Sequence, residues 1–193
     1  LSSALLALVM PVLAWHGGPQ AYWGVAALGF CFHVLDCVDG NMARTAGTAS
    51  KLGGLVDGFV DLSFWCLLFL SLGLLVEKAG GGIFGDRAAE LGLGLAVLVL
   101  LNRATRETYA ASHGQTTYFR SEIPDRLGFG DLLGIAVAGL EGSYVFGIAL
   151  GGYFGVLDRV MLAIAIYVLL IFVVALGLTF SQAARADRVS APR

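Results

Sequence analysis

The chain alternates between long apolar stretches and short polar links. An α-helix needs about 20 predominantly apolar residues to cross the ~30 Å hydrocarbon core of a bilayer, and most of the stretches approach or exceed that length. The pattern predicts an all-α integral membrane protein, a bundle of six transmembrane helices that forms a single domain over residues 1–193. The predicted helices cover approximately residues 1–14, 21–43, 52–76, 88–109, 129–150 and 157–181.

Two further details of this pattern concern the bundle. Several stretches are rich in Gly and Ala, which lets helix backbones approach closely in lipid. The first stretch would extend only about 21 Å as a helix, less than the hydrocarbon core, so we expect residues before Leu1 in a longer natural chain. The expected links are Trp15–Gln20, Thr45–Ser50, Glu77–Arg87, Ala110–Gly128 and Gly151–Leu157.

Composition supports a membrane protein. Hydrophobic residues make up 58% of the chain and charged residues 13%, which excludes an ordinary soluble domain. The formal net charge is −2, and no nucleic-acid partner is expected. Cys31, Cys37 and Cys66 all fall in predicted membrane helices, which favours buried thiols over a disulfide framework.

Four aspartates and one arginine interrupt the second and third stretches, all within 26 residues. An ionised side chain at the centre of a membrane helix costs roughly 2.5–3.5 kcal/mol on insertion scales and usually marks a functional site. Four carboxylates would also repel one another unless positive charge lies between them. The pattern therefore predicts two bound divalent ions, and ligation by oxygen alone favours Mg²⁺ or Mn²⁺. The residues are Asp36, Asp39, Arg44, Asp57 and Asp61.

Helical spacing places the acids on two facing stripes. Asp36 and Asp39 lie about 60° apart on the second predicted helix, and Asp57 and Asp61 lie one turn apart on the third. The short link Thr45–Ser50 makes these two helices antiparallel neighbours. We therefore expect the two acidic stripes to face each other below the membrane surface.

These residues carry a resemblance to the CDP-alcohol phosphotransferases, which are membrane enzymes of phospholipid biosynthesis. The family pattern D-x2-D-G-x2-A-R-x8-G-x3-D-x3-D is complete in this chain, with every fixed position and spacing intact. The motif covers about an eighth of the chain, and the predicted membrane layout extends the likeness over nearly all of it. The fixed positions are Asp36, Asp39, Gly40, Ala43, Arg44, Gly53, Asp57 and Asp61.

The resemblance implies a role for each acid. Asp36, Asp39 and Asp57 would bind the metal ions, and Asp61 would serve as a metal ligand, as the general base, or as both. The chemistry agrees, because two divalent ions can clamp a diphosphate and a nearby carboxylate can take the proton of an attacking hydroxyl. Spacing alone does not identify the base.

The resemblance also implies a pocket for the CDP group. Gly40, Ala43 and Gly53 would line the cytidine site together with Asp39, and Arg44 would contact a phosphate of the nucleotide. Other interpretations of these residues stay open at this point. The small residues could serve tight helix packing, and Arg44 could anchor the helix end at lipid headgroups.

Outside the motif, Arg103 and Arg106 form an i, i+3 pair at the end of the fourth predicted helix. They either anchor that end at the membrane surface or bind an anionic acceptor alcohol. His33 lies on the Asp36 face, and we interpret it as a packed bundle residue rather than as a metal ligand. Glu141 is an isolated acid in the fifth stretch, for which the sequence offers no explanation.

Basic residues predict the orientation of the bundle. If the link Thr45–Ser50 lies in the cytoplasm, nine of the 12 Lys and Arg lie inside and three lie outside, the bias that cytoplasmic loops show. The metal site and both termini would then face the cytoplasm, at a plasma membrane of bacterial type. The inside residues are Arg44, Lys51, Arg103, Arg106, Arg120, Arg126, Arg185, Arg188 and Arg193, and the outside residues are Lys78, Arg87 and Arg159.

The function predicted from these patterns is transfer of a substituted phosphate group. A hydroxyl of an acceptor alcohol displaces CMP from a CDP-alcohol, with CDP-diacylglycerol as the expected donor. The acceptor is inositol phosphate, glycerol phosphate, serine or another alcohol, membrane lipid surrounds the protein, and the resemblance implies a homodimer. One rival is a small membrane cation transporter that uses the intramembrane carboxylates, and another is a non-catalytic scaffold that kept the motif.

Overall fold

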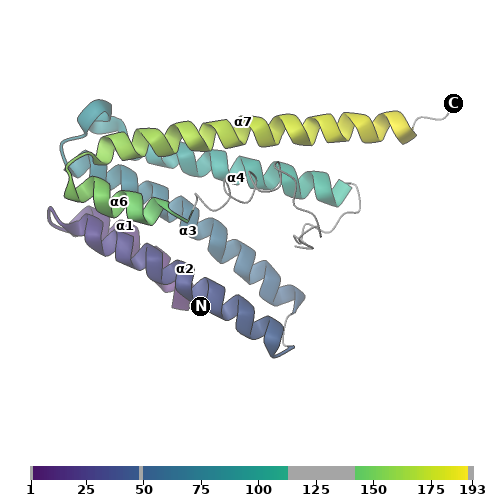
Figure 1. Ribbon diagram of the computed structural model, residues 1–193, viewed down its shortest axis with the longest axis horizontal. Helices are drawn as coiled ribbons and strands as arrows, with labels where there is room; N and C mark the ends of the chain where they lie inside the picture. Colours follow the sequence, from purple (N-terminus) through teal and green to yellow (C-terminus); the bar gives the residue numbers. More distant parts are fainter. Residues whose placement is uncertain (1, 48–49, 113–141, 191–193) are drawn as a thin grey trace, which may run out of the picture.

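The computed structural model describes residues 2–47, 50–112 and 142–190, and this part of the chain is helical without a strand (Figure 1). The prediction of an all-α chain is confirmed. The elements are α1 (Ser2–His16), α2 (Ala21–Thr45), α3 (Lys51–Lys78), the short 3₁₀ helix η1 (Gly82–Arg87), α4 (Ala88–Ser112), α6 (Tyr144–Tyr153) and α7 (Leu157–Ser190).

The helices follow the predicted stretches with a few differences. α7 continues to Ser190 instead of ending near residue 181, and η1 occupies part of the Gly-rich link that we expected to be irregular. Most of the fifth stretch, including Glu141, lies outside the described residues, and α6 contains its last part. Three described helices are long and apolar enough to cross a membrane, over Ala21–Met42, Leu52–Lys78 and Leu157–Ala184.

Local hydrogen bonds build the ends of the two motif helices. Thr45 is the last residue of α2, and its hydroxyl donates to the Asn41 carbonyl at 2.9 Å. Gly47 then adopts φ = +63°, the left-handed conformation that glycine accepts readily after a helix. Ser50 caps α3, because its hydroxyl accepts the Gly53 N–H at 3.0 Å and so satisfies one free donor of the first turn. The chain thus reverses between α2 and α3, which run antiparallel (Figure 1).

α3 packs against both α1 and α4 and carries much of the core. A Cβ added at Gly73 would lie 2.5 Å from the Ala88 carbonyl oxygen, and one added at Gly92 would lie 2.4 Å from the Phe69 oxygen. No side chain fits at either place, so the backbones of α3 and α4 meet directly. This is the close approach that glycine allows between helices in lipid.

The two ends of the bundle differ in shape. The links α1–α2, α3–α4 and α6–α7 gather at one end, around a cavity of about 640 Å³ whose lining includes Gly17, Lys78 and Asp158. The α2–α3 turn lies at the opposite end, toward which α7 also extends (Figure 1). The four aspartates lie in the halves of α2 and α3 that are nearer to this turn.

Candidate active site

The acidic site lies between α2 and α3. Asp36 of α2 interacts electrostatically with Asp57 and Asp61 of α3, and with Asp39 one turn along its own helix. The acids of the two helices are therefore close enough to interact electrostatically. Asp36 and Asp61 are half-buried, whereas Asp39 and Asp57 are exposed. The end of the site nearer the α2–α3 turn is therefore exposed, and the end nearer the bundle interior is half-buried.

A cation reaches this site from α4. Arg103 attracts the Asp61 carboxylate, and its Nη2 atom lies 3.6 Å from where a Cβ on Gly58 would be. The guanidinium Nε also pairs with Glu107 Oε1 at 2.7 Å, one turn along α4. Because Gly58 has no side chain, the arginine can lie against α3 at the level of the acids. Arg106 lies one turn further along the same helix.

Aromatic rings close the deeper side of the site. The His33 ring lies 4.9 Å from the Phe64 ring and 5.7 Å from Trp65, measured between centroids. Phe32 stacks on Phe64 at 3.9 Å. Within the described part of the chain, His33 Nε2 is buried without a hydrogen-bond partner, so His33 is packed as a bundle residue, although its ring nitrogen is not satisfied.

The chemistry of the donors fits a hard divalent cation. All four acids supply oxygen ligands, which Mg²⁺ and Mn²⁺ prefer, and no described Lys or Arg forms an ion pair with any of them. Among the described residues, no three His, Cys, Asp or Glu side chains are grouped closely enough to hold an ion. The carboxylates are therefore neighbours across two helices without forming a closed cluster.

The residues of the expected CDP pocket lie on both sides of the turn. Gly40 is half-buried on α2, one turn after Asp36, and Gly53 lies exposed in the first turn of α3. Ala43 and Arg44 belong to the last turns of α2, and their side chains lie outside the described part of the structure. Gly40 and Gly53 thus lie on the same two helices as the acids, near the α2–α3 turn.

Comparison with known families decides what kind of protein this is. Residues 1–121 match the sequence model of the family described as CDP-alcohol phosphatidyltransferase, and that span contains α1 to α4 with the complete acidic motif. The chain belongs to the CDP-alcohol phosphatidyltransferase family. Neither the curated proteins nor the solved structures include a match to this chain.

Membership of the CDP-alcohol phosphatidyltransferase family defines the class of reaction. The family transfers a phosphoalcohol group from a CDP-alcohol to an alcohol and generally depends on divalent metal ions. The protein is therefore a transferase of phosphate-containing groups, and its long apolar helices fit a membrane protein. The matched residues do not extend to α6 and α7.

Two residues at the site were missed by the sequence reasoning. Trp65 interacts with the Asp61 side chain, and Glu107 pairs with the Arg103 guanidinium. Each lies four residues after its partner on the same helix, which is the spacing of facing side chains. A search for polar side chains at i+4 from each candidate residue would have found both.

Proposed function

We propose that this protein is a phospholipid-synthesising membrane enzyme that transfers a phosphatidyl group from CDP-diacylglycerol to the hydroxyl of an acceptor alcohol and releases CMP. The observation that carries this proposal is the complete eight-residue motif on two antiparallel helices, with Asp36 of α2 in electrostatic contact with Asp57 and Asp61 of α3.

The four aspartates are the proposed metal ligands. Asp36 and Asp39 would act from α2, and Asp57 and Asp61 from α3, together holding two Mg²⁺ or Mn²⁺ ions. Ions bound there neutralise the charge of a diphosphate and polarise the bond that breaks. Two observations support this assignment. Mg²⁺ and Mn²⁺ prefer the oxygen ligands that the aspartates supply, and none of the described Lys or Arg side chains forms an ion pair with these aspartates.

Asp61 is the proposed general base. Its half-buried position and its interactions with Arg103 and Trp65 support this role. During transfer, the acceptor oxygen forms a bond to the phosphorus that carries the diacylglycerol group, and its proton passes to Asp61. The bond from that phosphorus to the bridging oxygen breaks, and the electron pair leaves with CMP.

The donor and acceptor would bind on the open side of the acids. Asp39, Gly40, Ala43, Arg44 and Gly53 form the proposed CDP pocket, in which small residues make room for the nucleotide. Arg103 and Arg106 of α4 are the proposed contacts for the acceptor. The position of Arg103 beside Gly58 supports this, because a guanidinium there can bind an anionic acceptor next to the reacting acids.

The membrane arrangement that we infer follows from the same assignment. The bundle would have six spans, with the α2–α3 turn in the cytoplasm, where CDP-alcohols are made. Three long apolar helices and the gathering of three links at the other end support it. A homodimer is carried over from the resemblance.

The test is CMP release by purified protein with CDP-diacylglycerol, Mg²⁺ and a panel of acceptor alcohols. We expect CMP release with at least one acceptor and its loss in Asp57→Asn, because the amide removes one negative charge from the metal-binding set. Ion flux through vesicles that contain the protein, together with no CMP release from any acceptor, would support a cation transporter instead.

A further inference from the structure

One side chain outside the motif contacts the reacting acids, and it belongs to Trp65. It lies four residues after Asp61 on α3, and its side chain interacts with the Asp61 carboxylate. Residues at i and i+4 face the same side of a helix. Trp65 therefore lies just deeper in the bundle than the acid, on the side away from the α2–α3 turn.

Rings from three helices hold the indole in place. Its centroid lies 5.2 Å from Phe64 and 6.2 Å from Phe69 on α3, 5.7 Å from His33 on α2, and 5.7 Å from Tyr144 on α6. Phe64 and Phe69 are fully buried. A ring packed on several sides has few rotamers open to it, so the position of its N–H is set before any ligand arrives.

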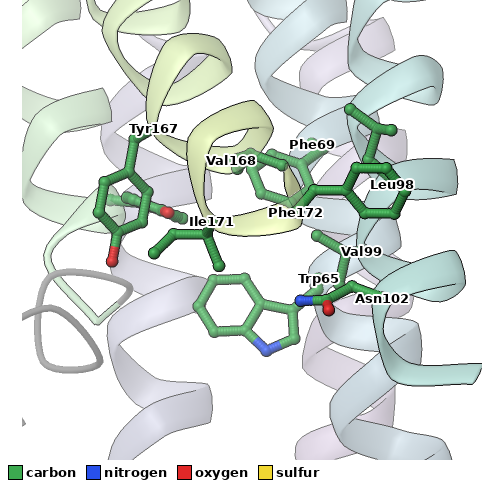
Figure 2. Close-up of a pocket in the computed structure, with 10 residues that line it drawn as sticks. Trp65, Phe69, Leu98, Val99, Asn102, Tyr167, Val168, Ile171 and Phe172 are labelled. Carbon is green, nitrogen blue, oxygen red and sulfur yellow. The ribbon is translucent and has the colours of Figure 1, made fainter. Parts of the chain in front are cut away.

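The indole also lines a small cavity of about 50 Å³ between α3, α4, α6 and α7. Figure 2 shows the Trp65 ring at this cavity, with Asn102 of α4 beside it and Ile171 and Phe172 of α7 nearby. Asn102 directly precedes Arg103. The cavity is too small to admit a nucleotide or an alcohol, so Trp65 acts from behind the site.

We propose that Trp65 is a positioning residue for Asp61, and that its N–H holds one carboxylate oxygen while the other faces α2 and the substrates. This inference rests on the proposed function of Asp61. A carboxylate has two acceptor oxygens, and a rigid donor on one of them restricts the side chain to a single orientation. The proton of the acceptor then meets an oxygen whose place is already defined.

The hydrogen bond can be tested without measuring activity. Changing Trp15 and Trp23 to Phe leaves Trp65 as the last of the three tryptophans, so the ¹⁵N-labelled protein gives a single indole N–H resonance by NMR. We expect Asp61→Ala to move this proton resonance upfield, because the acceptor is lost. Asp57→Ala, which removes the next acid on the same stripe, should leave it in place.

Two results would overturn the hydrogen bond. One is an indole resonance that does not respond to Asp61→Ala. The other is a resonance that responds to Asn102→Ala instead, which would assign the N–H to the amide across the small cavity. Neither result depends on catalysis, so a protein that releases no CMP would refute the proposed function and leave this test intact.

Kinetics then separates positioning from packing. Trp65→Phe keeps a ring but loses the N–H, and we expect kcat for CMP release to fall about tenfold, the order of one lost hydrogen bond to a charged group, with KM for the CDP-alcohol unchanged. Phe69→Leu loses a ring that packs on Trp65 but keeps the N–H, and it should retain kcat. Equal losses in both variants, or an unchanged kcat in Trp65→Phe, would overturn the positioning role.

Discussion

At the scale of single residues, the site depends on a missing side chain as much as on those present. Gly58 lies between Asp57 and the next turn of α3, and the Arg103 guanidinium occupies the space beside it. A Cβ at this place would meet Nη2 at 3.6 Å, which is ordinary van der Waals contact. One carbon therefore fits, whereas a longer side chain would take the place of the guanidinium.

This geometry predicts different outcomes for two substitutions of Gly58. Gly58→Ala should keep CMP release near the wild-type rate. Gly58→Leu should displace the Arg103 guanidinium and lower kcat/KM about tenfold, because the proposed hydrogen bond from Arg103 to an anionic acceptor is lost. The measurement is CMP release at several acceptor concentrations. Similar rates in the leucine and alanine variants would mean that Arg103 does not work from this position.

At the scale of helices, the contact between α3 and α4 determines which residues meet. Gly73 and Gly92 let the two backbones touch at one level. This contact sets which residues of α3 and α4 lie opposite each other along the rest of the interface. The same packing places Arg103 of α4 beside Gly58 of α3, on the acidic side of the bundle. The glycines at the crossing thus help to set the position of Arg103, although they lie several helical turns from it.

Two alanine substitutions test this crossing. Gly73→Ala would place a Cβ 2.5 Å from the Ala88 oxygen, and overpacking of this kind costs about 1–3 kcal/mol. Gly94→Ala on α4 meets nothing within 4 Å, so it should be neutral or slightly stabilising through its higher helix propensity. Thermal unfolding in detergent measures both. A Gly73→Ala variant as stable as Gly94→Ala would contradict a direct backbone contact.

At the scale of the whole molecule, the arrangement of the links bears on orientation. The α1–α2, α3–α4 and α6–α7 links gather around one cavity, and the α2–α3 turn lies at the opposite end (Figure 1). In a membrane these two ends would lie on opposite sides. Lys78 and Arg159 line the cavity at the end with the three links, which is the side that the basic residues predict to face outward.

Cysteine labelling tests the orientation. In a variant without Cys31, Cys37 and Cys66, a cysteine introduced as Phe154→Cys lies in the exposed α6–α7 link, and Ala46→Cys lies in the exposed α2–α3 turn. An impermeant maleimide should label Phe154→Cys on intact cells and Ala46→Cys only after permeabilisation. The reverse pattern would mean that the bundle has the opposite orientation in the membrane. Labelling of both cysteines on intact cells would contradict the proposed spans.

The helical class, the helices of the motif and the reversal that joins them could all be predicted from the amino-acid sequence. These features depend on local physics: apolar length, i, i+4 spacing, the Ser50 cap and a left-handed glycine all act within one or two turns. The same local physics predicts that the acids of α2 and α3 lie near one another, because a short turn makes the two helices neighbours, and Asp36 does interact electrostatically with Asp57 and Asp61.

The surroundings of these acids, in contrast, depend on how the helices pack and could not be predicted from the sequence. The approach of Arg103 to Asp61, and the rings of α2 and α6 around Trp65, join segments far apart in the chain. A helix that is apolar on all sides has no periodic pattern to show which face meets its neighbour. In lipid that choice depends on close packing at small residues such as Gly73 and Gly92, and such contacts exist only once the helices have assembled.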